Sequence, residues 1–182
     1  MGKVFKTSLI LFSVCMLLAS CGNATEPLKQ EPTGEQTSSE EIITDLNQPI
    51  WIGKSFSLMD ATWKFSNYKV AETIGDIKPS KEAFHTIDVD IDAKTPLNLE
   101  NIRFEMVDVF GNKFNLTENK DVYKSVVSAG RISVDQILAM SSLDYKVTLV
   151  FEGLKKTQGV SIEILEKTDS GEKRIALIDT GV

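Results

Sequence analysis

The sequence has few of the side chains that build most catalytic and metal sites. Its 182 residues include one histidine and two cysteines, whereas zinc sites and nucleophilic triads draw on several such residues. A nucleic-acid interface is also disfavoured, because 20 Lys and Arg stand against 26 Asp and Glu, for a formal charge of -6. We therefore expect no enzymatic activity, no cofactor, no metal ion and no nucleic-acid partner.

The apolar run near the N-terminus is too short to be a permanent membrane span. Residues 8–19 would extend about 18 Å as a helix, against about 30 Å for the hydrocarbon core of a bilayer. Lys3 and Lys6 precede the run. A basic start followed by a short apolar stretch is typical of a secretory signal peptide.

The run ends in Leu18-Ala19-Ser20-Cys21, which resembles the lipobox of bacterial lipoproteins. The resemblance implies that residues 1–20 are a signal peptide cleaved before Cys21, and that Cys21 carries a diacylglyceryl thioether. Two acyl chains hold a protein stably on a membrane, so the chain would be anchored on the extracytoplasmic face. Cys15 would be removed, which leaves no intrachain disulfide. An ordinary signal peptide with a chance cysteine is the alternative.

A polar segment follows the lipobox. Residues 21–46 are rich in Glu, Gln, Thr, Ser and Pro, contain no aromatic side chain and have no sustained apolar period. This composition is typical of a disordered linker, here an acidic one. We expect it to tether residues 47–182 to the membrane.

Residues 47–182 have the pattern of short β-strands. In Ile87 to Ile91, apolar residues alternate with Asp, as in a half-buried strand. The same period marks residues 145–151 and 160–164. Weaker candidates are residues 55–59, 62–70, 102–109, 113–117, 122–127 and 174–178. Eight or nine short strands predict an all-β fold, an antiparallel β-sandwich in which two sheets bury their apolar faces against each other.

Three local features refine this expectation. In residues 102–109 the apolar side chains fall on even-numbered positions up to Met106 and on odd-numbered positions from Val107, and this switch predicts a β-bulge between the two residues. Gly111-Asn112 predicts a hairpin that turns near residues 110–113. Ser133 and Gln136 have the spacing of a capping box, which predicts one short helix over residues 133–139.

A second resemblance spans about residues 50–166. The strand at 84–91, the segment Ile102 to Phe114 with its Asp-Val-Phe-Gly turn, and the later stretches 150–152 and 160–165 are similar to the immunoglobulin-like domain of unknown function found in Gram-positive lipoproteins, the DUF4352 type. This resemblance implies an immunoglobulin-like β-sandwich and supplies no catalytic residues.

Asp88, Asp90 and Asp92 invite a calcium hypothesis, because several calcium loops begin with alternating Asp residues. In an extended strand, Asp88 and Asp92 would lie about 13 Å apart, and calcium ligands lie only about 2.3 to 2.6 Å from the ion. We therefore expect an exposed acidic ridge and no metal site.

The sole histidine, His85, shares the apolar parity of Ile87 and Val89. We interpret it as a core or sheet-end residue with satisfied nitrogens, since a general base would need a nucleophile and an orienting carboxylate nearby. Ser141 and Ser142 lie in no nucleophile-elbow pattern. The remaining aromatic candidates fit the core or the sheet rim better than a ligand platform: Trp51, Trp63, Phe65 and Tyr68.

The sequence thus favours a non-enzymatic extracytoplasmic lipoprotein that binds a protein or another envelope component. A structural or protective module without a specific ligand is the main alternative, and a secreted hydrolase is a second one. Specificity should lie on loops, and we expect residues 73–81 and 94–101 to carry it. Their apolar side chains are either partner anchors or caps of the core: Ile74, Ile77, Leu97 and Leu99.

Overall fold

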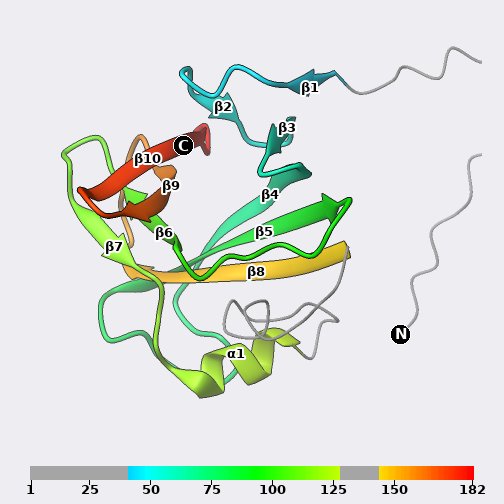
Figure 1. Ribbon diagram of the computed structural model, residues 1–182. Helices are drawn as coiled ribbons and strands as arrows, with labels where there is room; N and C mark the ends of the chain where they lie inside the picture. The colour runs from blue at the N-terminus through cyan, green and yellow to red at the C-terminus, as the bar shows by residue number, and fades with distance from the viewer. Residues whose placement is uncertain (1–40, 128–143) are drawn as a thin grey trace, which may run out of the picture. The chain divides into compact units, whose positions relative to one another are not determined.

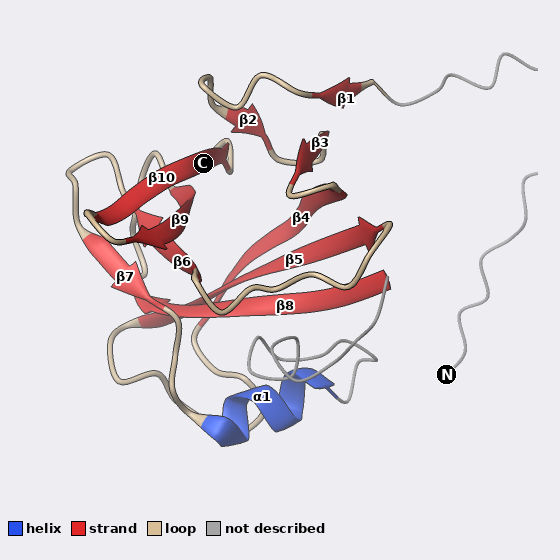
Figure 2. Ribbon diagram, viewed as in Figure 1, coloured by secondary structure: helices blue, strands red, loops and turns tan. Residues whose placement is uncertain are grey.

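The computed structural model describes residues 41–127 and 144–182. In these ranges the chain forms ten β-strands and one α-helix. The strands make two five-stranded sheets that face each other, as Figure 1 shows. Figure 2 shows the single helix at one margin of this body.

The first sheet has the strand order β1-β3-β4-β5-β8. Its strands are β1 (Ile42–Ile43), β3 (Ser55–Leu58), β4 (Ala61–Ala71), β5 (Ala83–Ala93) and β8 (Asp144–Gly153). The last four pair antiparallel, and β1 pairs parallel with β3 at the edge.

The second sheet has the strand order β2-β10-β9-β6-β7. Its strands are β2 (Ile50–Trp51), β6 (Ile102–Val107), β7 (Lys113–Asn115), β9 (Ser161–Thr168) and β10 (Gly171–Asp179). Pairing is antiparallel except between β2 and β10, which run parallel. An isolated bridge from Leu116 to Phe151 links the end of β7 to β8 of the first sheet.

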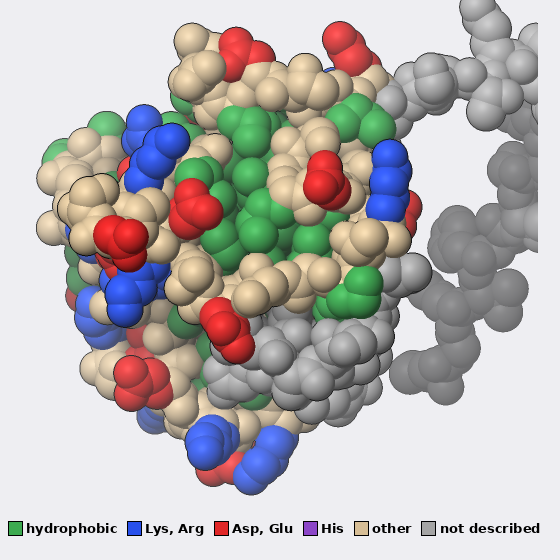
Figure 3. All heavy atoms as spheres, in the orientation of Figure 1, with side chains coloured by type: hydrophobic (Ala, Val, Ile, Leu, Met, Phe, Trp, Pro, Cys, Tyr) green, Lys and Arg blue, Asp and Glu red, His purple; other side chains and the backbone are tan. Residues whose placement is uncertain are grey.

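The core lies between the two sheets because each sheet turns one apolar face inward. In β5, Ile87, Val89 and Ile91 are each 1% exposed, and the intervening Asp residues point to the other face, as the two-residue period of a strand requires. The rings of Trp63 in β4 and Phe104 in β6 lie 6.4 Å apart across the interface. In Figure 3, hydrophobic side chains form an area between β10 and β5, with charged side chains around it.

The all-β sandwich predicted from the alternating pattern is confirmed. The three strongly periodic segments are β5, β8 and β9, and all weaker candidates except one lie in strands. The hairpin is also confirmed: β6 and β7 pair antiparallel, and the amide of Asp108 donates to the carbonyl of Asn112 across the turn. The edges depart from a purely antiparallel arrangement, since β1 and β2 each pair parallel.

The strand predicted at residues 122–127 is wrong, because these residues belong to helix α1 (Lys120–Val127). Asn119 caps this helix: its Oδ1 accepts a hydrogen bond from the amide of Asp121 at 3.0 Å. Val122 and Tyr123 are buried, and Val126 packs beside them. This spacing is that of one helical face; the β-branched residues had suggested a strand.

The predicted bulge between Met106 and Val107 is also wrong. Both residues keep a continuous register with β7 and β9. The parity changes because the strand ends at Val107, which is half-buried, and the turn begins at Asp108. Register shifts occur instead between Ser66 and Lys69 and between Arg174 and Ala176.

The folded body begins earlier than predicted. The linker was expected to extend to Leu46, yet β1 at Ile42–Ile43 pairs with β3, and Ile43 and Leu46 pack against the main core. A strand of two residues is too short to reveal a period, so the sequence pattern missed it. The described residues belong to one unit, Ser38–Val182.

Several predictions fall outside the described residues: the signal peptide, Cys21, most of the linker, the helix at 133–139, and Ser141 with Ser142. Within residues 41–127 and 144–182, no helix is long and apolar enough to cross a membrane.

Candidate functional site

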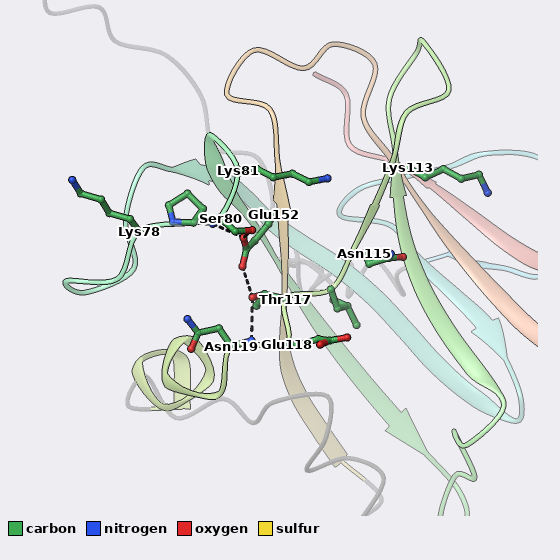
Figure 4. Close-up of a pocket in the computed structure, with 11 residues that line it drawn as sticks. Lys78, Ser80, Lys81, Lys113, Asn115, Thr117, Glu118, Asn119 and Glu152 are labelled. Carbon is green, nitrogen blue, oxygen red and sulfur yellow. Dashed lines mark hydrogen bonds between the residues drawn. The ribbon is translucent and has the colours of Figure 1, made fainter.

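A groove of about 520 Å³ lies where the loop before β5 meets β7, the start of α1 and the end of β8. Three lysines border it, and hydroxyl, amide and carboxylate groups fill the space between them, as Figure 4 shows. We call this site the lysine groove. It is lined by Lys78, Pro79, Ser80, Lys81, Lys113, Asn115, Leu116, Thr117, Glu118, Asn119 and Glu152.

Glu152 joins the walls of the lysine groove. Its carboxylate accepts hydrogen bonds from the amide of Ser80 at 2.6 Å and from the Ser80 hydroxyl. On the other side it accepts from Thr117 Oγ1 at 2.5 Å. Thr117 is itself buried, and its amide donates to the carbonyl of Val150 at 2.8 Å. One carboxylate thus fixes a loop and a strand end that lie far apart in the sequence.

The same contacts set the charge state of Glu152. Burial raises the pKa of its carboxyl, but hydrogen bonds from the side chains of Ser80 and Thr117 and from the amides of Ser80 and Lys81 outweigh that effect, so the pKa is lower than usual. A carboxylate held ionised by several donors is a weak base. Its position suits the binding and ordering of the groove better than proton transfer.

Two of the three lysines are available to an incoming anion. Lys78 is exposed and makes no ion pair within the described part of the chain. Lys81 Nζ lies 4.8 Å from the centroid of the Phe114 ring, a cation–π contact that leaves the ammonium hydrogens partly free. Lys113 is engaged: its Nζ lies 2.6 Å from Glu105 Oε2, and this hydrogen bond raises its pKa.

A second hollow of about 540 Å³ borders the other side of residues 115–118. Arg103 and Lys120 line it, together with Tyr123, whose hydroxyl donates to the carbonyl of Thr117 at 2.7 Å. Arg103 is paired with Glu105 and Glu172. The segment between the two hollows is therefore held from both sides.

The three aspartates of β5 stand on its outer face, as predicted. Asp88 accepts hydrogen bonds from Thr148 Oγ1 at 2.7 Å and from Asn67 Nδ2 at 3.0 Å. Asp90 lies in register between Lys64 of β4 and Lys146 of β8. No group of three or more acidic, His or Cys residues in the described ranges could hold a metal ion.

His85 is a satisfied core residue, which confirms the interpretation of its parity. It is fully buried; its Nδ1 lies 2.7 Å from the Tyr68 hydroxyl and its Nε2 lies 2.9 Å from the carbonyl oxygen of Leu154. Burial lowers the pKa of His85, and the hydrogen bond to Leu154 raises it by a smaller amount, so the pKa is below its usual value. Burial raises the pKa of Tyr68 to about 12.

The aromatic candidates divide as expected between core and rim. Trp63 and Phe65 are buried, and Tyr68 packs against the core. Trp51 is 59% exposed on the edge strand β2.

The four loop residues proposed as partner anchors or core caps are packed. Leu99 is 4% exposed in the main core, and Leu97 packs against that core. Ile74 and Ile77 form a bridge with each other and pack against the cluster that includes Val122 of α1. We assign these four residues to the capping of the core.

The sequence analysis did not single out the residues of the lysine groove. Ser80, Thr117 and Glu152 come from three distant parts of the chain and match no motif. The sequence signal was local: Lys78 and Lys81 flank Pro79-Ser80 in the loop 73–81, which had been selected because it joins candidate strands and mixes Pro with charged residues.

No protein-family model matches the chain, and no curated protein matches it. Among solved structures, it is similar to the crystal structure of MPT63, a secreted protein from Mycobacterium tuberculosis, with 9% sequence identity and a TM-score of 0.45. The match covers 73% of this chain and 98% of MPT63. The fold class follows from the two sheets described above.

Proposed function

We propose that the protein is a lipid-anchored extracytoplasmic binding protein, whose sandwich binds an anionic component of the cell envelope in the lysine groove. The observation that carries this proposal is that Lys78 and Lys81, which make no ion pair among the described residues, line one groove together with hydroxyl and amide groups. Ammonium groups attract phosphate or carboxylate, and hydroxyl and amide side chains bind the polar groups beside them.

The lipobox-like sequence that ends at Cys21 supports the proposed location. A lipid on that residue and an acidic tether would keep the sandwich close to envelope polymers. Affinity for each anionic group would be modest, and it would fall as salt rises, because exposed charges are screened. A repeated anionic polymer would compensate by offering many groups to many anchored copies.

The groove favours binding over catalysis. Its central carboxylate has a lowered pKa and accepts hydrogen bonds from Ser80 and Thr117. The one histidine of the chain lies elsewhere, buried between Tyr68 and Leu154. A hydroxyl without a base of suitable pKa is a poor nucleophile.

The test is co-sedimentation of residues 38–182 with cell-envelope polymers from which the membrane lipids have been extracted, so that binding to a bilayer does not contribute. We expect Lys78→Glu with Lys81→Glu to reduce binding at least about fivefold at low salt, because two attractions become repulsions. A matched control carries the same charge change at Lys94 and Lys167, both exposed and outside the groove. Equal binding by both double variants would refute groove binding, and no binding by the wild type would favour a purely structural module.

A further inference from the structure

Four exposed apolar side chains gather at one end of the sandwich. Trp51 is 59% exposed, Val109 63%, Phe110 77% and Val182 55%. Large apolar side chains exposed as a group on a folded body mark an interaction surface more often than scattered ones do. We call this group the end patch.

Backbone hydrogen bonds connect the segments that carry the end patch. The amide of Val109 donates to the carbonyl of Gln158 at 3.1 Å, and the amide of Val160 donates to the carbonyl of Val182 at 3.1 Å. The amide of Ile52, next to Trp51, donates to the carbonyl of Asp179 at 2.9 Å. The turn after β6, the loop before β9, the C-terminal segment and β2 therefore meet at this end.

The turn that presents Phe110 is held by several hydrogen bonds to Asp108. The buried carboxylate of Asp108 accepts hydrogen bonds from the amides of Phe110 and Asn112 at 2.9 and 2.8 Å, and from Asn112 Nδ2 at 2.8 Å. The amide of Gly111 donates to the carbonyl of Asp108 at 2.9 Å. The hydrogen bonds already hold the backbone of Val109 and Phe110 in place while the two side chains are exposed to water. Their burial against a partner therefore costs little further conformational entropy.

We propose that the end patch docks the sandwich on a lipid bilayer. Tryptophan and phenylalanine partition well to the interface between headgroups and acyl chains. The four side chains project from a turn, a strand edge and a chain end, and a bilayer accepts such projections without a shaped pocket. Lys54, whose amide donates to the carbonyl of Trp51, and Lys156, two residues before Gln158, are exposed on the segments that meet at the patch and supply positive charge for anionic headgroups. Asp179, half-buried and bonded to the amide of Gly181, supplies one negative charge on the same segments.

The length of the chain ahead of the sandwich fits this orientation. If Cys21 is lipidated, as the proposed function holds, about 20 residues separate the lipid from β1, and a flexible coil of that length would span about 25 Å. Trp51 follows β1 closely in the sequence, so the patch stays within reach of the membrane. Docking by the patch itself does not require the lipid or the lysine groove.

The test uses residues 38–182, which contain every strand and every buried side chain described above and so hold a complete core. The chain has two tryptophans, and only Trp51 is exposed, since Trp63 is 0% exposed. Mixing the protein with vesicles of phosphatidylcholine, or of phosphatidylcholine with phosphatidylglycerol, should shift the Trp51 emission to the blue. Brominated acyl chains should quench that emission.

Val109→Ser with Phe110→Ser should reduce the vesicle partition coefficient at least about tenfold, since two side chains no longer leave water. Trp51→Phe should abolish the spectral shift and retain sedimentation with vesicles. Met59→Ser, at an exposed apolar residue on the turn between β3 and β4, should bind as the wild type does.

Three results would overturn the proposal. The first is the absence of both the shift and sedimentation with either vesicle. The second is equal binding by the turn variant and the Met59→Ser control. The third is self-association through the patch, seen as a concentration-dependent mass that Phe110→Ser abolishes, which would make a second copy the partner. The variant Lys78→Glu with Lys81→Glu should keep its binding to phosphatidylcholine vesicles. This result would distinguish a failure of the groove proposal from a failure of the end-patch proposal.

Discussion

The Tyr68 hydroxyl lies 2.7 Å from His85 Nδ1 in the first sheet. Because His85 Nε2 faces the carbonyl oxygen of Leu154 at 2.9 Å, Nε2 carries the proton in the neutral imidazole and Nδ1 accepts from the tyrosine. A second proton would remove that acceptor and place a charge in a fully buried site. The pair therefore selects the neutral histidine.

Stability should depend on pH through this pair. The folded-state pKa of His85 is below its usual value, so its contribution is fully present above about pH 6.5 and is lost as the pH falls through the folded-state pKa. Urea unfolding at pH 7.5 and 5.5 should show a lower stability at 5.5. His85→Gln should flatten this difference, because His85 is the only histidine and carboxylates titrate lower; an unchanged difference would assign the effect to another group.

The carboxylate of Glu152 should contribute more to the stability of the protein than the carboxylate of Glu118, which is exposed in the same lysine groove. The Glu152 carboxylate accepts three hydrogen bonds, and in Glu152→Gln an amide NH2 group, itself a donor, would face some of the same donors. The free energy of unfolding should fall by about 1–2 kcal/mol. Glu118→Gln, in the same groove but exposed, should cost little. Chemical denaturation of both variants at pH 7 measures the difference, and equal stabilities would show that Glu152 does not order the groove.

The packed loop residues should behave as caps of the core. Ile77→Ser and Leu97→Ser each remove apolar contacts from a partly buried site, at a cost of about 1–3 kcal/mol. For a body of this size the melting temperature should fall by about 3 to 10 °C. Phe110→Ser, at a side chain that is 77% exposed, serves as the control. If the melting temperatures of the loop variants equal that of the control, Ile77 and Leu97 do not cap the core, and the two loops again become candidate partner surfaces.

The two cysteines offer a matched test of the anchor. Cys21→Ala should block lipidation and processing, so fractionation and gel mobility should show a larger or released product. Cys15→Ala changes a residue inside the apolar run and should leave anchoring intact. Retention and normal trimming of the Cys21→Ala protein would contradict the lipoprotein assignment.

The sequence predicted those parts of the fold that a two-residue period encodes. Ile87, Val89 and Ile91 identify β5 by their alternation with Asp. β1 and β2 could not be found in this way, since each has two residues. Helix α1 was assigned to a strand because its valines favour strands, although Asn119 supplied a capping signal.

The candidate site was beyond sequence reasoning for a different reason. Glu152 meets Ser80 and Thr117 through contacts between residues that are 72 and 35 positions apart. No local pattern records such pairs. The register of β5 with β8 brings the Ser80 loop to Glu152, and the bridge between Leu116 and Phe151 brings Thr117 there. The end patch arises likewise from three separate segments, and only its Val109-Phe110 tip is visible in the sequence as apolar residues in a turn.

The most direct test of groove binding is site-specific photo-cross-linking of the anchored chain in its native envelope. A photoreactive residue at Asn115, which lines the lysine groove, should form a cross-link to an anionic envelope component, and Lys78→Glu with Lys81→Glu should abolish it. The same probe at Lys94, beyond the far end of β5, should capture none. Equal cross-linking from both positions, or capture from Asn115 that survives the charge reversal, would contradict binding in the groove.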